Sequence, residues 1–352
     1  MSDIATNLSL SGIILIVLLA PFLFRRLEEN LEGFLFVMGA AAATFSGAWT
    51  LHLVEEALVD PIKITLAVLF AGLLFHYVGH RVVRRAVQAI RKRVPLGLFV
   101  GLLIVSTGLV SSVISAIIAA LVLVEVVAAL SLERRATVAL TVVACLSIGL
   151  GAVMTPLGEP LSTIATAKLQ GAPHNADFFF LARLLWPYVL PGVFGAGLVG
   201  AFLVPALAGK TEVVTTAEES SGLHEVLIRT VKVYVFVMAL TLLGSGFKPI
   251  IDQYFVNVPP EGLYWANASS AILDNATVAA AEIGPALSTD QIQGALIAML
   301  VAGVMLIPGN IPNIISAGKL RISMKEWAKV GVPLGLPAML IYFLVLYLPT
   351  YF

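Results

Sequence analysis

The sequence predicts an all-α, polytopic membrane protein with about eight spans and two re-entrant hairpins, arranged as two inverted repeats with broken helices. Three observations lead to this prediction: the composition, the length of the apolar runs and a pattern that occurs twice. Of the 352 residues, 59% are hydrophobic and only 12% are charged, and the mean hydropathy is +0.98. These values lie far from the usage of soluble domains, so we expect most of the chain to lie in lipid.

Charge and cysteine content exclude several classes of protein. Lysine plus arginine equals aspartate plus glutamate, at 21 each, so no net charge favours nucleic acid as a partner. The single cysteine, Cys145, excludes an internal disulfide and a cysteine-based metal cluster. We find no nucleophile elbow and no phosphate-binding loop, which argues against an enzyme and against a nucleotide as partner.

Crossing about 30 Å of hydrocarbon takes about 20 mostly apolar residues in a helix. Six uninterrupted runs of about this size lie between charged residues. The first has no basic segment before it and no small-residue cleavage site after it, so it predicts a span rather than a signal peptide. The six spans are expected at residues 8–24, 33–50, 62–79, 178–208, 223–243 and 331–351.

Two further spans, 136–169 and 290–320, are interrupted by proline and glycine. The interruptions read TPLGEP at 155–160 and IPGNIPN at 307–313. Since proline ends a helix and can begin the next one, each interruption predicts a break followed by a short half-helix.

Two other apolar stretches, 94–130 and about 248–283, carry polar residues midway. These are the serine pair that begins at Ser111 and the segment SSAILDN that begins at Ser269. We interpret both stretches as re-entrant hairpins that enter and leave the membrane on one face.

Lysine and arginine fall mainly on one side of this arrangement. Cytoplasmic loops collect basic residues, so that side is expected to face the cytoplasm. Both termini are then expected outside the cytoplasm, in a multi-pass protein of the cell inner (plasma) membrane. The basic residues of the cytoplasmic side lie at 25–26, 81–93, 134–135, 210 and 319–329.

The two broken spans align with each other without a gap. PLGEPLSTIATAKL from Pro156 lies over IPGNIPNIISAGKL from Ile307, so that Glu159 is matched with Asn310. The order hairpin, broken span, proline-marked span occurs twice, and three crossings separate the hairpins, so the second copy is inverted. Small-residue and proline motifs that permit close helix packing are the alternative explanation, but three matching pairs in one order favour a repeat.

The repeat divides the chain into five segments. N-terminal scaffold spans precede the first repeat, a polar cytoplasmic linker follows it, and one more scaffold span precedes the second repeat. In that order, the segments are expected at residues 1–93, 94–208, 209–222, 223–244 and 245–352.

A helix broken inside the membrane leaves backbone groups unpaired, so it is expected to line a cavity or bind a ligand. Residues with side-chain oxygen, the ligand type that hard cations such as Na⁺ prefer, lie at both breaks and at the second hairpin tip. Half-helix N-termini could alternatively hold an anion. The candidate ion-binding residues are Thr155, Ser162, Thr163, Ser269, Ser270, Thr277 and Asn313, together with the Na⁺ candidates Glu159, Asp274, Asn275 and Asn310.

Asp274 and Glu159 are the strongest candidates, because a carboxylate near the bilayer midplane is costly unless a proton or a cation neutralises it. The alternative for Glu159 is a structural role as N-cap of the half-helix that follows. Glu125 and Glu282 lie nearer to hairpin ends, where snorkelling or pairing with a lysine accounts for them. Lys319, at a half-helix end, is expected to cap a C-terminus.

Three segments resemble the ion transporter superfamily, which includes NhaD-type sodium/proton antiporters, arsenite efflux carriers and dicarboxylate/sodium symporters. SSAILDNATVAAAE (269–282) resembles its "VDN" segment, and TPLGEPLST (155–163) resembles the NhaD-type segment in which an aspartate follows S-P-I-G. GNIPN (309–313) occupies the place of the second broken-helix motif. The chain is also similar to a small prokaryotic family described as sodium or cation transporters.

The resemblance implies an elevator-type carrier, usually a homodimer, with a scaffold domain that holds the partner and a transport domain that contains both hairpins. By position, Asp274 and Asn275 correspond to the acidic site of the second hairpin, and Glu159 to the acidic residue of the first break. The first hairpin, SSVISAIIAA from Ser111, lacks the asparagine that family members often carry. This departure argues against a symmetric pair of sodium sites.

Two functions are therefore expected. The first is a cation/proton antiporter, in which Asp274 and Glu159 alternately hold a proton or Na⁺. The second is a sodium-coupled symporter of a small anion or carboxylate. Either function needs no cofactor beyond Na⁺ or H⁺, and the expected partners are the lipid bilayer, a small inorganic ion or small anion, and a second copy of the chain.

Overall fold

The computed structural model is all-helical over the residues it describes, and five of its helices are long and apolar enough to cross a membrane. Such helices indicate a membrane protein. The five are α6 (Leu96–Ile114), α8 (Arg134–Ala152), α10 (Phe180–Leu207), residues Thr230–Ile250 of α11 (Leu223–Tyr254), and α16 (Met324–Tyr347). The structure describes residues 3–24, 26–27, 30–74, 85, 87, 89–90, 93–208, 223–254 and 258–348.

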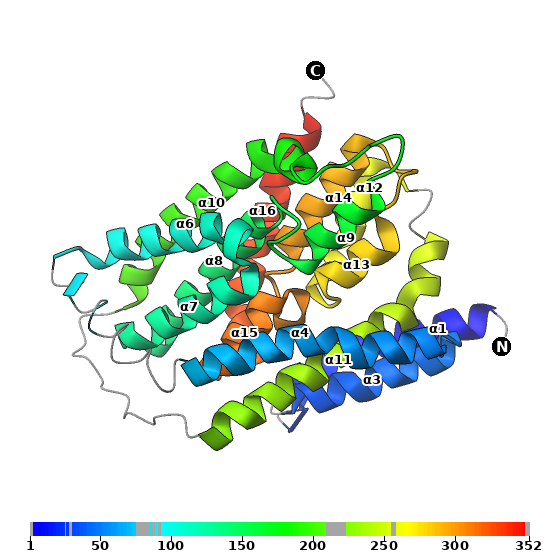
Figure 1. The fold of residues 1–352 in the computed structure, drawn as a ribbon, viewed down its shortest axis with the longest axis horizontal. Helices are drawn as coiled ribbons and strands as arrows, with labels where there is room; N and C mark the ends of the chain where they lie inside the picture. Colours follow the sequence, from blue (N-terminus) through cyan, green and yellow to red (C-terminus); the bar gives the residue numbers. More distant parts are fainter. Residues whose placement is uncertain are drawn as a thin grey trace.

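The helices form two layers (Figure 1). The first layer consists of α1 (Asp3–Leu23), α3 (Leu31–Ser46), α4 (Leu51–Leu74) and α11, in which α11 packs against both α3 and α4. The second layer contains α6 to α10 and α12 to α16, and it meets the first where α11 contacts α13 and α15 and where α4 contacts α7.

Small residues let α11 and α3 of the first layer approach closely. A Cβ atom on Gly246 of α11 would lie 2.6 Å from the Cβ of Ala42 on α3, and one on Gly39 would lie 2.8 Å from the carbonyl oxygen of Ala239. Such small-residue contacts are typical of helices packed in membranes, where close van der Waals contact stabilises the pair.

The first predicted hairpin is a pair of adjacent helices, α6 and α7 (Ala116–Leu130), with Ser115 between them. Ser115 has φ 78°, a backbone conformation that is uncommon for a residue with a Cβ atom. The chain therefore turns at Ser115 and not at Ser111, which lies inside α6. The hydroxyl of Ser111 donates to Ile148 O of α8 at 3.0 Å.

The second predicted hairpin consists of α12 (Pro260–Ala266), the 3₁₀ helix η2 (Asn267–Ala271) and α13 (Asn275–Glu282). Its predicted start at 248 is wrong, because α11 continues to Tyr254 with Pro249 inside it. A proline inside a membrane helix is tolerated where neighbours satisfy the freed carbonyl group, so the proline did not mark a boundary here.

Both predicted helix breaks are confirmed. α8 ends at Ala152 and α9 (Pro160–Lys168) follows after a non-helical segment. α14 (Thr289–Ala302) is followed by the short 3₁₀ helix η3 (Ile307–Gly309) and then by α15 (Ile311–Leu320). A proline lies in the first turn of both α9 and α15, where its missing N–H group breaks no helical hydrogen bond.

Several predicted span boundaries are wrong by up to about three turns. The helix expected at 62–79 begins at Leu51, and its first turns carry charged residues that a hydropathy pattern does not distinguish from a loop. Residues 75–79 lie outside the described residues. The span expected at 33–50 ends at Ser46, where Gly47 takes a left-handed conformation that caps the helix. The span expected at 331–351 begins at Met324, behind the N-cap Ser323. The linker predicted at 209–222 lies outside the described residues.

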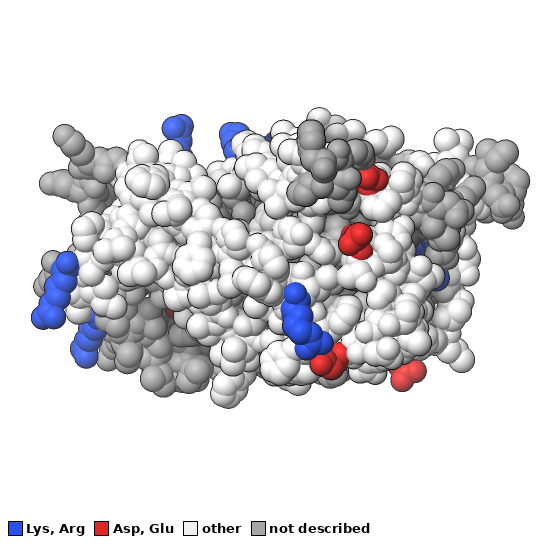
Figure 2. Space-filling view, turned by 90° about the horizontal axis from the view of Figure 1, so that it is seen from above, with Lys and Arg blue, Asp and Glu red and all other residues white. Residues whose placement is uncertain are grey.

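The outer surface fits a lipid environment. Figure 2 shows a face with few lysine, arginine, aspartate or glutamate side chains. On α10, the large side chains of Phe194, Leu198 and Phe202 are exposed. Exposed apolar side chains along a spanning helix are expected where lipid replaces water as the solvent.

Candidate functional site

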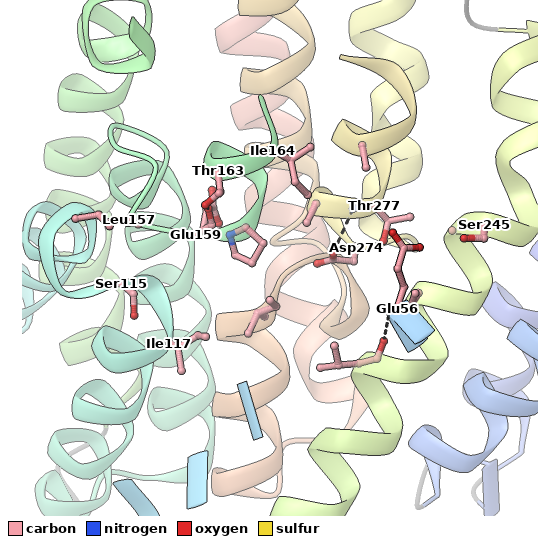
Figure 3. A pocket seen from close by; sticks show the side chains of 18 of the residues that line it. Glu56, Ser115, Ile117, Leu157, Glu159, Thr163, Ile164, Ser245, Asp274 and Thr277 are labelled. Atoms are coloured by element: carbon pink, nitrogen blue, oxygen red, sulfur yellow. Dashed lines mark hydrogen bonds between the residues drawn. The ribbon is translucent and has the colours of Figure 1, made fainter. Parts of the chain in front are cut away.

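A cavity of about 780 Å³ lies where the first layer meets the hairpins and the half-helices (Figure 3). Its walls come from α4 and α11 on one side and from α7, α9, α13 and α15 on the other. The polar and charged residues that line it are Glu56, Ser115, Glu159, Thr163, Thr241, Ser245, Lys248, Asp274 and Thr277.

Glu159 is the N-cap residue of α9 and lies in the cavity wall with 5% of its surface exposed. Its backbone N–H donates to the hydroxyl of Ser162 at 3.3 Å. Its side-chain oxygen Oε1 is buried and has no hydrogen-bond partner among the described residues. The position at a helix N-terminus stabilises negative charge, so the structural role anticipated for Glu159 is present, but it leaves one carboxylate oxygen unsatisfied.

Asp274 occupies the corresponding position at α13, as its N-cap residue. Its Oδ2 atom accepts a hydrogen bond from the backbone N–H of Thr277 at 3.3 Å, and 8% of the residue is exposed. Because α9 packs against α13, the structure brings the N-terminus of a half-helix and that of a hairpin arm, each with a carboxylate, to one cavity (Figure 3).

Two of the predicted threonines also line the cavity. The Thr163 hydroxyl donates to Pro156 O at 2.6 Å, which ties α9 to the non-helical segment before it. Thr277 lies on α13 and faces α11, where a Cβ atom on Gly244 would overlap its side chain. Of the eleven predicted residues, these two and the two carboxylates are therefore the ones that the structure places at the cavity surface.

Three predicted residues instead satisfy backbone carbonyls of the second break. The Asn313 carboxamide donates to Gly303 O at 2.7 Å and to Leu306 O at 3.0 Å. The Asn275 carboxamide, with its nitrogen toward the break, donates to Gly309 O and Met299 O, both at 2.9 Å. The Ser270 hydroxyl also bonds to Met299 O, at 3.1 Å. Side chains of the second hairpin tip thus bind carbonyl groups at the second break and at the end of the helix before it.

The first break is held in a similar way. The Thr155 hydroxyl donates to Ser112 O of α6 at 2.5 Å, and the Ser162 hydroxyl lies 2.7 Å from Thr155 O. Ala116 N, at the first hairpin turn, donates to Gly158 O at 2.7 Å. These bonds join the first break to the first hairpin.

The remaining predicted residues lie close to these networks. Asn310 is the N-cap residue of α15, is buried, and lies beside the Glu159 carboxyl group. Ser269 is partly buried in η2, and its carbonyl oxygen accepts from the backbone N–H of Leu273 at 3.1 Å.

Matched positions of the two breaks have nearly the same backbone geometry. Glu159 has φ −156° and ψ 163°, and Asn310 has φ −156° and ψ 147°. The glycine before each is in close contact with the end of the preceding helix: a Cβ on Gly158 would overlap Ala152 O, and one on Gly309 would overlap Gly303 O.

Sequence reasoning missed the first-layer wall of the cavity. Glu56 of α4 and Lys248 of α11 both line it, as does the hydroxyl-bearing Ser245. The sequence does not single out Glu56, because the charged stretch around it resembles a loop. An acid near an apolar run is nevertheless a signal of function in a membrane protein.

A buried ion pair lies outside the cavity, between Glu125 of α7 and Lys319 of α15. The Glu125 side chain is 3% exposed. The interpretation of Glu125 as the partner of a lysine is confirmed, and Lys319 pairs with it in addition to lying in the last turn of α15. Lys168, in the last turn of α9, donates from its ammonium group to Ala280 O of α13.

Comparison with known proteins adds one finding. No curated protein matches the chain. Residues 7–348 match the model of one protein family, DUF1646, whose description is "Protein of unknown function".

Proposed function

The chain belongs to the DUF1646 family, and we propose that it is a secondary active transporter that exchanges a small cation, Na⁺, for protons. The observation that carries the proposal is the cavity that contains Asp274 and Glu159, each at the N-terminus of a short helix. One oxygen of Glu159 lacks a partner among the described residues.

Two carboxylates in one membrane cavity need neutralising charge. A proton or a cation supplies it, and a carboxylate that accepts either one can exchange them. Since two like charges in a medium of low dielectric repel strongly, binding of Na⁺ at one acid favours loss of a proton from the other. Backbone and hydroxyl oxygens near the acids provide further ligands of the type that hard cations prefer.

We further propose eight crossings and two re-entrant hairpins in two inverted repeats. The matched backbone geometry of Glu159 and Asn310 supports the repeat. So does the packing, in which the half-helix of each broken span contacts the second arm of the other half's hairpin: α9 packs against α13, and α15 against α7. Discontinuous helices in inverted repeats are a common build of secondary transporters.

The position of the cavity supports an elevator mechanism. It lies between the first layer and the hairpins, so sliding of the second layer along the first would carry Asp274 and Glu159 from one side of the membrane to the other. In this proposal the first layer is the fixed scaffold and the surface through which two copies form a homodimer in the inner membrane.

Proteoliposomes test the exchange directly. We expect an imposed Na⁺ gradient to move protons across the membrane, which a pH-sensitive dye detects. We expect Asp274→Asn and Glu159→Gln each to abolish this signal. Correctly inserted protein that binds Na⁺ in a melting assay but moves no protons would rule out exchange. Protein that neither binds Na⁺ nor moves protons would rule out the cation site as well.

A second candidate function is Na⁺-coupled uptake of a small anion, and one observation favours it. Lys248 lines the same cavity as the N-termini of α9 and α13, and both an ammonium group and helix N-termini attract anions. Uptake of radiolabelled small carboxylates that requires Na⁺ and is lost in Lys248→Gln would support it. Proton movement without any anion would favour the antiporter.

A further inference from the structure

One side-chain hydrogen bond joins the two arms of the second hairpin, away from the cavity. Asn267 begins η2 on the first arm, and Glu282 ends α13 on the second. The Asn267 Nδ2 group donates to Glu282 Oε1 at 2.9 Å and also to Leu263 O at 2.9 Å. Asn267 is fully buried, so its carboxamide is held in one place by the hairpin.

Each of these two side chains has one buried oxygen without a hydrogen-bond partner in the part of the chain that the structure describes. Asn267 Oδ1 and Glu282 Oε2 make no hydrogen bond with any described residue. A buried acceptor that lacks a donor is destabilising, and an ionised carboxylate without a counter-charge is more so. The geometry therefore contains two defects within one hydrogen-bonded pair.

A single proton removes both defects. A carboxylic acid has one donor and one acceptor oxygen, and a carboxamide has a donor nitrogen and an acceptor oxygen. Since Nδ2 of Asn267 already donates to Oε1, a proton on Oε2 provides the donor that Asn267 Oδ1 lacks. We propose that Glu282 is a proton-binding site, whose protonated form makes a paired carboxylic acid and carboxamide with Asn267 and so fastens the arms of the second hairpin.

The charged groups around the pair are consistent with a proton as the group that neutralises Glu282. The charged groups described on the elements next to the pair include Glu261 of α12, Asp274 at the start of α13, Lys168 of α9, Lys232 and Lys248 of α11, and Asp290 of α14. The Lys168 ammonium, on the helix packed against α13, is bound to Ala280 O. The hydrogen bond that Glu282 accepts within the described part of the chain comes from Asn267.

Glu282 can bind a proton whether or not the protein is a transporter. The effect of that proton on transport is a separate matter. The pair lies on the same hairpin as Asp274, so loss of the proton as pH rises would loosen the hairpin beside the cavity. This consequence for transport rests on the proposed function.

Infrared spectroscopy of the full chain in lipid nanodiscs tests the proposal. We would use the Asp274→Asn, Glu159→Gln double variant as background, since it removes the two acids proposed to exchange protons. The C=O stretch of a protonated carboxylic acid is expected in this background, is expected to vanish on addition of Glu282→Gln, and is expected to shift with Asn267→Leu. An unchanged spectrum on addition of Glu282→Gln would show that Glu282 is ionised and would overturn the proposal, whether or not the protein transports Na⁺.

A stability measurement provides an independent readout. In Glu282→Gln, the amide nitrogen can donate permanently to Asn267 Oδ1, so we expect the melting temperature of this variant not to fall as pH rises. The melting temperature of the unmodified chain is expected to fall when Glu282 loses its proton. Equal falls for both proteins would contradict the proposal, and Glu282→Ala, which cannot form the pair, is expected to melt lower than either at acidic pH.

Discussion

At the scale of single residues, Asp274 and Ser288 form a matched pair of helix caps. Asp274 accepts from the backbone N–H of Thr277 at the start of α13, within the cavity wall. Ser288 accepts from the backbone N–H of Gln291 at 3.2 Å at the start of α14, in an exposed position. Both stabilise a helix in the same way, so any difference between their variants reports the additional role of Asp274.

We predict that Asp274→Asn abolishes Na⁺-dependent proton movement and leaves thermal stability nearly unchanged, because asparagine caps a helix as well as aspartate does. Ser288→Ala should have the opposite effect, a loss of about 1 kcal/mol of stability with full transport. Transport assays and melting curves on both variants check this. Normal transport by Asp274→Asn would remove this residue from the proposed site.

Glu159 has a matched control in Glu133, the N-cap residue of α8, which is exposed. Because one oxygen of Glu159 is buried without a partner among the described residues, neutralising this carboxylate should raise stability by about 1 kcal/mol or more in the absence of Na⁺. We expect Na⁺ to raise the melting temperature of the unmodified chain but not that of Glu159→Gln. Glu133→Gln should respond to Na⁺ as the unmodified chain does, and equal Na⁺ responses in all three proteins would exclude Glu159 as a ligand.

At the scale of elements, the breaks depend on glycines that have no room for a side chain. A Cβ on Gly309 would overlap Gly303 O, whereas nothing lies within 4 Å of a Cβ on Gly318, in the half-helix that follows. We predict that Gly309→Ala costs about 1–3 kcal/mol through overpacking, and that Gly318→Ala is neutral or stabilises by up to about 1 kcal/mol through its helix propensity. Thermal unfolding distinguishes them, and similar melting temperatures would show that the break can relax.

The Glu125–Lys319 ion pair links α15 to α7, and because the pair is buried, its loss is expected to have a large effect on stability. Replacing one partner removes the counter-charge that this pair supplies, which for a buried pair typically costs about 3–5 kcal/mol. We therefore expect Lys319→Met to unfold at a much lower temperature, and the double variant with Glu125→Gln to recover most of the loss.

An exposed ion pair gives the comparison for this prediction. Arg183 and Asp177 are 60% and 59% exposed, and the hydrogen bond from Arg183 holds the pKa of Asp177 below its ordinary value. Solvent screens such a pair, so Arg183→Gln should barely change the melting temperature. A loss as large as that of Lys319→Met would show that burial does not set the difference.

The breaks could be predicted from the sequence because their signal is local. Proline, glycine and polar residues interrupt apolar runs at 155–160 and 307–313, and helix physics leaves few other conformations for such segments. α4 could not be placed from local signals, since its first turns carry Glu55, Glu56 and Asp60. A charged helical turn and a charged loop look alike in a hydropathy pattern, and tertiary contact with α11 decides between them.

Within the site, the sequence predicted which polar residues lie near the cavity and the breaks, but not which groups they bind. The carboxylate of Glu159 reaches the cavity from the first break, and that of Asp274 reaches it from the second hairpin. In contrast, Asn275 and Asn313 bind backbone carbonyls of the second break. Which carbonyl an asparagine reaches depends on how η2 and η3 pack, and no spacing in the sequence encodes that contact.

At the scale of the whole molecule, the two layers meet along a surface that the proposed mechanism requires to slide. α11 is the main contact of the first layer with the second, through α13 and α15. Near the cavity this contact is close, since a Cβ built on Gly244 would lie 3.0 Å from the Cβ of Thr277. A covalent bond at this point would hold the layers in the arrangement that the structure describes.

We predict that the pair Gly244→Cys and Thr277→Cys, in a Cys145→Ala background, forms a disulfide on oxidation, because Cβ atoms about 3.5–4.5 Å apart are bridged readily and the built separation is only slightly shorter. Cys145 is the sole native cysteine, so this background leaves no competing thiol. Oxidised protein should bind Na⁺ in a melting assay but move no protons, and reduction should restore proton movement to the level of the reduced single variants. Undiminished transport by a fully cross-linked sample would show that the layers need not slide past each other at this contact, and would overturn the elevator mechanism.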